Sequence, residues 1–274
     1  MLSVAAKNET TKRRQQWVVV QSNVNALKLN NASAEYIRLT EDYREKIEDE
    51  LKEICLETIT MVENVLLPRL LGVSEHAVVK QEQKADESDE QITQDSPKTV
   101  TTMITEGAVG HSPRHKSDQK IFYLKMSGDY HRYMAEIQRG EARIPHSLRS
   151  REAYEKALEI ARDPKAGVAT THPIRLGLAL NYSVFHHEIR EDTEAAINIA
   201  QQALDEGLED LDALSEMPRA YKDAALILKL LKDNIAMWQA FAAQKSNNGG
   251  SSGDDGGVEA VQKQLSQTHI EEKE

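Results

Sequence analysis

The chain has 274 residues, of which 34 are basic and 45 acidic, and its formal net charge of -11 argues against a general nucleic-acid-binding surface. Aromatic residues make up only 5%, and Gly and Pro are sparse, so helices are favoured over sheets. The single cysteine, Cys55, excludes an internal disulfide and fits a reducing compartment. No apolar run approaches the roughly 18 residues of a membrane span, and no signal peptide opens the chain. We therefore expect an acidic, soluble, cytoplasmic helical protein, with access to the nucleus left open.

Hydrophobic periodicity predicts two long helices at the start of the chain, over about 2–27 and 33–70. The second helix carries an apolar stripe, interrupted by a threonine, that consists of Tyr43, Ile47, Leu51, Ile54, Met61 and Val65. After this helix the sequence turns polar and the periodicity disappears. Plain loops of such length are uncommon in compact domains, so we expect a disordered insertion over 72–116, with 1–71 as the first part of the helical domain.

Five further helical patterns follow, over about 117–140, 147–162, 173–190, 192–214 and 219–243. All seven prolines lie outside the predicted helices or at their edges, as expected for a residue that breaks helix interiors. The connections are short, which makes consecutive helices antiparallel neighbours. We therefore expect an all-α fold, an antiparallel array of about seven helices. In this array 117–245 completes the domain and 246–274 forms a disordered acidic tail.

The sequence lacks the motifs that mark common enzyme sites. It has no Gly-rich phosphate loop, no nucleophile elbow, and no CxxC or HExxH pair. His186 and His187 are adjacent, so on a helix their side chains point about 100° apart and cannot share a metal ion. We therefore expect a protein that is not an enzyme and that needs no cofactor and no metal.

Basic residues on two of the predicted helices are more informative. Lys7 and Arg14 are seven residues apart, so they project from one helix face about 10 Å from each other. Arg132 and Tyr133 are neighbours on a different helix. One interpretation of the basic run at 12–14 is a solvated charge run or a nuclear-import patch. The other is a clamp for a phosphoserine, whose charge of about -1.5 to -2 and three acceptor oxygens would match two guanidiniums, an ammonium and a phenol.

An amide lies in an otherwise apolar helical stretch, because Asn181 is surrounded in the sequence by Leu178, Leu180, Tyr182, Val184 and Phe185. A helix that is apolar on every side is a buried helix. An unpaired amide there would cost about 1–3 kcal/mol. Asn181 therefore forms either a hydrogen bond to another helix or a contact with a ligand.

A series of ordered segments resembles the 14-3-3 family. Residues 2–17, LSVAAKNETTKRRQQW, resemble the family's LLSVAYKNVVGARRSSW. The segments that follow in the family's order are YREKIEDELKEIC (43–55), FYLKMSGDYHRYMAE (122–136), THPIRLGLALNYSVFHHEI (171–189), LDALSE (211–216) and YKDAALILKLLKDNIAMW (221–238). The resemblance runs from Leu2 to Trp238, apart from the insertion.

The resemblance implies an adaptor that binds phosphoserine or phosphothreonine segments of client proteins in an amphipathic groove and regulates them in signalling. Its phosphate pocket falls on Lys7, Arg14, Arg132 and Tyr133. Its two amides for the ligand backbone fall on Asn181 and Asn234. Other groove positions fall on Lys125, Leu180, Val184, Glu188, Leu226, Ile227, Leu230, Met237 and Trp238. Phosphorylated client proteins are thus the expected partners, whereas nucleic acid and membranes are not.

The departures from the family concern assembly. The chain begins inside what resembles the third family helix, so two helices that supply one side of the dimer interface are expected to be absent. The other side of that interface is present as Tyr43, Lys46 and Glu50. A family serine before Trp17, which is a phosphosite in some members, is Gln16 here. We expect a weak homodimer and a preferred heterodimer with a full-length 14-3-3 protein.

Two alternatives to the adaptor function stay open at this point. One is a truncated, degenerate family remnant that binds no ligand. The other is a helical scaffold of the solenoid kind, against which the lack of any fixed repeat period counts.

Overall fold

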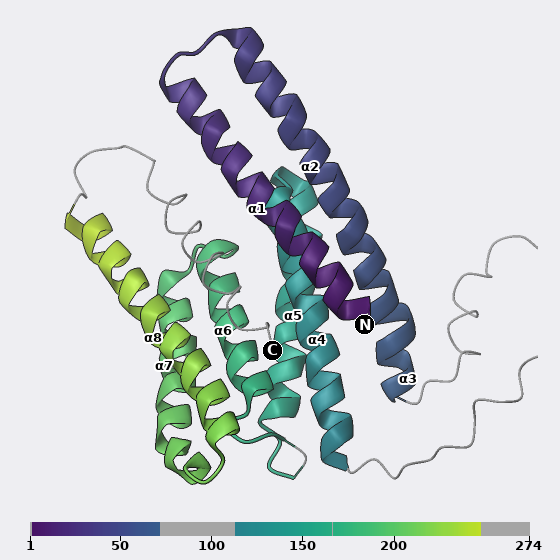
Figure 1. The fold of residues 1–274 in the computed structure, drawn as a ribbon, viewed down its shortest axis with the longest axis vertical. Helices are drawn as coiled ribbons and strands as arrows, with labels where there is room; N and C mark the ends of the chain where they lie inside the picture. The colour runs from purple at the N-terminus through teal and green to yellow at the C-terminus, as the bar shows by residue number, and fades with distance from the viewer. Residues whose placement is uncertain (1, 72–112, 166, 248–274) are drawn as a thin grey trace, which may run out of the picture.

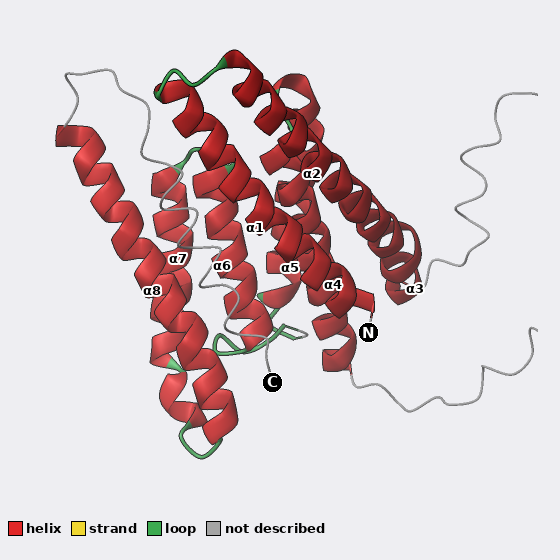
Figure 2. Ribbon diagram, turned by 45° about the horizontal axis from the view of Figure 1, so that its top comes forward, coloured by secondary structure: helices red, strands yellow, loops and turns green. Residues whose placement is uncertain are grey.

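The computed structural model describes residues 2–71, 113–165 and 167–247, and every regular element in these ranges is a helix (Figures 1 and 2). The α-helices are α1 (Leu2–Leu29), α2 (Ala34–Met61), α3 (Leu67–Leu71), α4 (Pro113–Ile137), α5 (Arg143–Ala161), α6 (Pro173–Glu188), α7 (Thr193–Glu209) and α8 (Pro218–Asn247). A π-helical turn joins α2 to α3 without a break, so the described chain has seven helical rods. The predicted all-α fold is confirmed.

Helices that are consecutive in the sequence lie side by side in space (Figure 1). The α1–α2 hairpin contacts the rest of the molecule mainly where α2 packs on α4. The helices α4, α5 and α6 pack on one another in turn. The helices α6, α7 and α8 form the other end of the array. Short connections therefore produce the antiparallel neighbours expected from the sequence.

Local sequence signals explain most helix ends. Ser33 caps α2 by accepting the Tyr36 N–H at 3.4 Å, and Asp192 caps α7 by accepting the Ala195 N–H at 2.9 Å. The helices α4, α6 and α8 each begin with a proline, the residue favoured in a first turn. The α4 helix starts at Pro113, four residues earlier than the helical pattern predicted. The rest of the expected insertion and nearly all of the expected tail lie outside the described residues.

The buried face of α2 differs from the predicted stripe. The residues that α2 buries are Arg44, Ile47, Leu51, Cys55 and Ile59. By contrast, Tyr43 is 53% exposed, and Met61 and Val65 lie on the surface as well. The predicted stripe was wrong at these positions. The buried residues of α2 pack instead on both neighbours: Ile47 and Leu51 cluster with residues of α1 and α4, and Cys55 and Ile59 cluster with residues of α4. Beyond Ile59, the π-helical turn over 62–66 shifts the register again.

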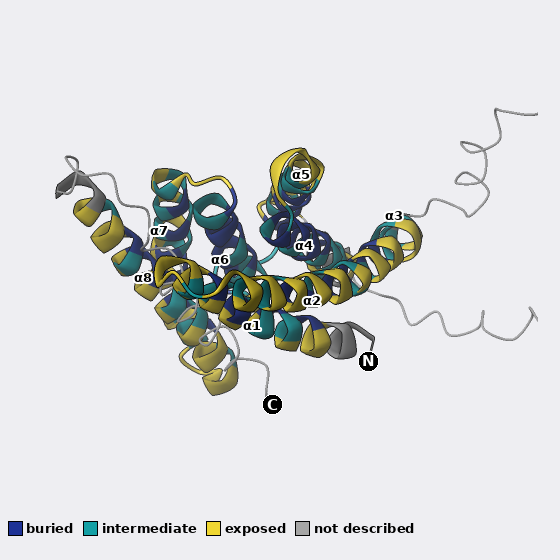
Figure 3. Ribbon diagram, turned by 90° about the horizontal axis from the view of Figure 1, so that it is seen from above, coloured by how far each residue is buried: buried dark blue, intermediate teal, exposed yellow. Residues whose placement is uncertain are grey.

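The core is continuous across α6. One cluster joins α6 to α7 and α8 through residues such as Leu176, Leu228 and Trp238. A second cluster joins α6 to α4 and α5 through residues such as Phe185 and Tyr154. Because both clusters use α6, this helix is buried along most of its surface, as its apolar sequence predicts (Figure 3). Its polar positions are consequently held in fixed places against α4.

Candidate functional site

Two arginines from distant parts of the sequence meet on one aromatic ring. The guanidinium carbon of Arg14 on α1 lies 4.1 Å from the centre of the Tyr133 ring on α4. The guanidinium carbon of Arg132 lies 4.7 Å from the same ring centre. Both distances fall in the range of cation–π contacts. The arginines are only 7% and 5% exposed, so two positive charges are held together at a largely desolvated site.

Carboxylates balance these buried charges. Arg14 donates from Nε and Nη2 to Glu136 Oε2, at 2.9 and 2.7 Å. Arg132 has Glu188 Oε2 and Asp129 Oδ1 each at 3.7 Å, which is a charge contact rather than a hydrogen bond. Burial lowers the pKa of both guanidiniums, but the neighbouring carboxylates and phenols outweigh it, and each pKa lies above the ordinary arginine value. Both arginines therefore stay charged.

The carboxyl of Glu188 is the unusual group in this cluster. Its Oε2 atom is buried and accepts no hydrogen bond from the described residues. Burial, together with the charge of Glu136, raises the pKa of Glu188 to about 7, although Arg132 and Arg14 oppose the shift. A carboxyl beside two arginines thus changes its charge near neutral pH.

The hydrogen-bond partner of Asn181 is a residue that the sequence did not point to. Asn181 Nδ2 on α6 donates to Asp129 Oδ1 on α4 at 2.8 Å. This contact is the hydrogen bond to another helix that was one of the two interpretations of this amide. The amide oxygen, however, accepts no hydrogen bond from the described part of the chain. One end of the amide is therefore held by α4, and the other end has no hydrogen-bond donor among the described residues.

The second predicted amide has no internal partner at either end. Asn234 on α8 is 6% exposed, and its side chain forms no hydrogen bond with the described residues. Four residues later, the Trp238 Nε1 atom is buried and also lacks a partner, while its ring lies against His187. A spacing of four places Asn234 and Trp238 on one side of α8. The Asn234 side chain therefore has capacity for hydrogen bonds that the described residues do not supply.

The two lysines of the predicted site lie on the helices that carry the arginines. Lys125 on α4 donates from Nζ to Asp129 Oδ2 at 2.9 Å. Lys7 is exposed on α1, two turns before Arg14. Three of the four predicted phosphate-binding residues are thus in mutual contact, and Lys7 is on the same helix face as Arg14.

The predicted apolar groove residues lie along the contact between α6 and α8. Leu180 and Val184 are 5% and 8% exposed and belong to the core cluster that includes Trp238. The partly buried residues that pack against this cluster from α8 are Ile227, Leu230 and Met237. Leu226 is 39% exposed and is the most open of the set. The more exposed apolar residues therefore form one wall of the predicted groove, and the buried ones support that wall from inside the core.

The predicted dimer residues lie on the exposed face of α2. Tyr43 is 53% exposed, and Lys46 and Glu50 are exposed as well. Glu50 Oε2 is already 2.7 Å from Arg13 Nε of α1. An apolar continuation of this face, toward the start of α2, is formed by Tyr36 and Leu39, which are 58% and 53% exposed.

The carboxylates that organise the site were missed in the sequence. Asp129 and Glu136 are respectively three residues before and four residues after Arg132 on α4. With Lys125 they follow a spacing of three and four, which places them on one helix face. That charge pattern was visible in the sequence. The contact of Tyr154 with Asp129 was not, because it depends on how α5 packs on α4.

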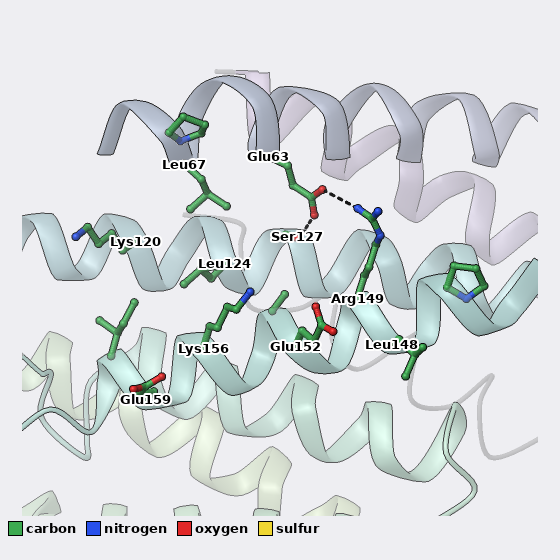
Figure 4. A pocket seen from close by; sticks show the side chains of 14 residues that line it. Glu63, Leu67, Lys120, Leu124, Ser127, Leu148, Arg149, Glu152, Lys156 and Glu159 are labelled. Atoms are coloured by element: carbon green, nitrogen blue, oxygen red, sulfur yellow. Dashed lines mark hydrogen bonds and ion pairs between the residues drawn. The ribbon is translucent and has the colours of Figure 1, made fainter. Parts of the chain in front are cut away.

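A separate groove of about 820 Å³ lies between α3, α4 and α5 (Figure 4). Its lining includes Leu67, Leu124 and Ala153, with Arg149 and Lys156 also on its walls. None of the residues predicted for the phosphate site or its groove lines it. The groove is therefore a second concave surface, separate from the predicted site.

The described residues offer little for metal or membrane chemistry. No group of three or more His, Cys, Asp or Glu within them is placed to hold a metal ion. Among these residues, no helix combines the length and the apolar character that crossing a bilayer requires. Burial raises the pKa of the Cys55 thiol to about 12, so this thiol is not activated as a nucleophile.

An all-α array in which two buried arginines from α1 and α4 share one aromatic ring defines a helical protein with a desolvated cationic cluster. The sequence model described as 14-3-3 protein matches residues 1–88 and 74–239. A 14-3-3 protein homolog 2 from Schistosoma mansoni is 36% identical over 238 residues, which cover 87% of each chain. The checkpoint signal transducer rad24 from Schizosaccharomyces pombe is 36% identical over 242 residues, 88% of this chain and 71% of that protein. The 14-3-3-like protein 2 from Caenorhabditis elegans is 34% identical over 243 residues, 89% of this chain and 77% of that protein.

The chain belongs to the 14-3-3 family, and the resemblance read from its sequence is confirmed. Its relatives support a role as a signalling adaptor.

Proposed function

We propose that this protein binds phosphoserine- or phosphothreonine-containing segments of client proteins and regulates those clients as a non-enzymatic adaptor. The observation that carries the proposal is the contact of Arg14 and Arg132 with the single ring of Tyr133. A phosphate dianion supplies the charge and the acceptor oxygens that two guanidiniums and a phenol hydroxyl bind best.

The electrostatics favour a ligand that is an anion. Arg14 and Arg132 keep their charges while burial removes most of their water. In the described chain, Arg14 is neutralised by Glu136 through two hydrogen bonds to one oxygen. Arg132 has only carboxylate contacts of 3.7 Å, so it retains capacity for a phosphate oxygen. Arg132 is consequently the arginine that we expect to bind the phosphate most directly.

The peptide chain on either side of the phosphate is expected to lie against Asn181 and Asn234. Both amides have hydrogen-bonding atoms without partners in the described residues. Main-chain N–H and C=O groups recur in every peptide, so amides can hold many different clients. The partly exposed residues of α8, above all Leu226, would contact the client's side chains.

We also propose that the exposed face of α2 around Tyr43 pairs with a second 14-3-3 protomer. Three apolar residues of this face, Tyr36, Leu39 and Tyr43, are more than half exposed. Exposed apolar surface of this kind marks a contact surface when it is contiguous. A full-length family member is the proposed partner, and the cytoplasm remains the predicted location.

The test is isothermal titration of the full chain with a phosphoserine peptide and with the same peptide lacking the phosphate. The unphosphorylated peptide should bind at least about a hundredfold more weakly, since its hydroxyl leaves the arginines without an anion. Equal affinities for the two peptides would show that the groove binds peptides whether or not they carry a phosphate. Binding of neither peptide would favour the degenerate remnant, the alternative that the relatives do not support.

A further inference from the structure

Asp129 is a buried carboxylate that accepts hydrogen bonds from three helices. Its Oδ2 atom accepts from Lys125 Nζ at 2.9 Å. Its Oδ1 atom accepts from Asn181 Nδ2 at 2.8 Å and from the Tyr154 hydroxyl at 2.5 Å. Arg132 Nη2 lies 3.7 Å from the same Oδ1. Three residues predicted to bind the ligand are therefore in contact with one residue that was not.

The ionisation state of Asp129 decides how its neighbours are oriented. Burial raises the pKa of this carboxyl, but the charges of Lys125 and Arg132 and the hydrogen bonds from Tyr154 and Lys125 together lower it by more. The net pKa lies below the usual aspartate value. The group is thus an anion at neutral pH, and an ionised carboxylate can only accept hydrogen bonds. Turning Asn181 over would direct its amide oxygen at this carboxylate. Two acceptors would then face each other in a buried place, which is unfavourable.

We propose that Asp129 is a positioning residue that fixes the polarity of Asn181, so that Asn181 Oδ1 serves as the acceptor for a main-chain N–H of the bound peptide. This role rests on the proposed phosphopeptide function. It has a consequence for specificity: the peptide residue that lies opposite Asn181 Oδ1 must carry a main-chain N–H. Proline and N-methyl residues are excluded at this position.

The same carboxylate joins the amide to the cationic side of the site. Lys125 and Arg132 are both held by Asp129 and both lie among the predicted ligand residues. Tyr154 approaches the carboxylate from α5 and also receives a hydrogen bond from Arg132 Nε at 3.3 Å. Substitution of Asp129 is therefore expected to weaken all phosphopeptides, so a general loss of affinity is not the diagnostic result. The diagnostic result is the dependence on one backbone N–H.

The experiment titrates the full chain with one phosphoserine peptide and with variants in which a single backbone N–H near the phosphate is methylated. For the wild type, methylation at one position should weaken binding about tenfold, the effect of one lost hydrogen bond to Asn181 Oδ1. In Asn181→Ala the same methylation should have no further effect. In Asp129→Asn the neighbour of Asn181 is an amide that can donate or accept, so the penalty should fall below about threefold.

Tyr154→Phe is the matched control, because it removes another hydrogen bond to the same Oδ1 and leaves Asn181 Nδ2 in place. This variant should retain the tenfold penalty even if its stability falls. The full penalty in Asp129→Asn would contradict the positioning role while leaving the adaptor function intact. A wild-type chain that tolerates methylation at every position would overturn the assigned polarity, and this result does not require any variant to fold. Failure of the wild type to bind the parent phosphopeptide would overturn the proposed function and this role together.

Discussion

At the scale of single residues, Lys7 differs from the other predicted phosphate ligands because it is exposed. Its exposure makes charge reversal tolerable for the fold, whereas Arg14 and Arg132 are buried. Replacing Lys7 with glutamate converts an attraction to the phosphate into a repulsion. We expect Lys7→Glu to weaken phosphopeptide binding by at least about tenfold, in line with charge changes at close ion pairs.

Lys12→Glu is the matched control for this prediction. Lys12 is exposed on the same helix, and the substitution makes the same change in net charge. Lys12 lies five residues after Lys7, so it projects from another face of α1. Titration should therefore give nearly wild-type affinity for Lys12→Glu. If both variants lose affinity equally, the effect comes from the overall field of the protein and not from a phosphate contact of Lys7.

A second prediction at the residue scale concerns Glu188 and the pH dependence of phosphopeptide affinity. Its pKa of about 7 is set by burial and by Glu136, against the opposing charges of Arg132 and Arg14. A bound phosphate adds negative charge at these arginines and should raise the pKa of Glu188 further. The complex therefore takes up a proton, and affinity should fall as the pH rises from 7 to 8.5. The phosphate itself stays a dianion over that range, since its second pKa is about 6.

Titration at pH 7.5 in two buffers of different ionisation enthalpy measures this proton directly. The wild type should take up a fraction of a proton per peptide bound, and Glu188→Gln should take up none. An equal proton count in the two proteins would show that Glu188 does not sense the ligand.

At the scale of helices, α4 organises the site, and its packing on α5 is tight. A Cβ atom at Gly128 would lie 2.8 Å from two ring carbons of Tyr154, a side chain that is fully buried. Overpacking of this kind costs about 1–3 kcal/mol, against a gain of up to about 1 kcal/mol from replacing glycine by alanine in a helix. We expect Gly128→Ala to lower the free energy of unfolding and the Tm, by about 2–6 °C.

Gly177 provides the comparison, because a Cβ there would meet only Lys125 Cε, at an ordinary 3.8 Å. Gly177→Ala should therefore keep or raise the Tm, through better helix propensity. Thermal unfolding of both variants checks the prediction. A Gly128→Ala protein as stable as Gly177→Ala would mean that α4 and α5 can separate slightly without cost.

The helices were predictable from the sequence because each has a periodic apolar pattern, and several have recognisable ends, such as Ser33 before α2 and the prolines that open α6 and α8. The face that α2 buries was not predictable from the pattern alone. Apolar residues such as Tyr43 and Met61 fit the same helical spacing as the true core residues. Packing against α4 decided between them.

The family resemblance predicted the basic residues and the amides of the site. It did not predict the carboxylates Asp129 and Glu136. The contact of Arg132 with Asp129 could be read from their spacing of three residues on one helix. The bond between Asn181 and Asp129 could not, because it requires the rotation and the axial shift of α6 relative to α4. Helix periodicity contains no information about either quantity.

At the scale of the whole molecule, the open question in the fold is what covers the outer face of α2. Tyr36, Leu39 and Tyr43 lie three and four residues apart and are each more than half exposed. We predict that the chain self-associates weakly and pairs preferentially with a full-length 14-3-3 protein. Sedimentation of the chain alone and mixed with such a protein measures both equilibria.

The double variant Leu39→Glu and Tyr43→Glu should abolish this pairing without affecting phosphopeptide binding, since both residues are exposed and belong to α2 alone. A tight homodimer at nanomolar concentration would contradict the predicted preference. A heterodimer that survives the double variant would place the contact elsewhere on the molecule.

A crystal structure of the chain with a phosphoserine peptide tests most directly whether Arg14, Arg132 and Tyr133 hold a phosphorylated client segment. Phosphate oxygens should lie within hydrogen-bonding distance of both guanidiniums and of the tyrosine hydroxyl, with the peptide main chain against Asn181 and Asn234. A phosphate bound away from these arginines, or a peptide seated in the groove between α3, α4 and α5, would contradict the proposed binding site.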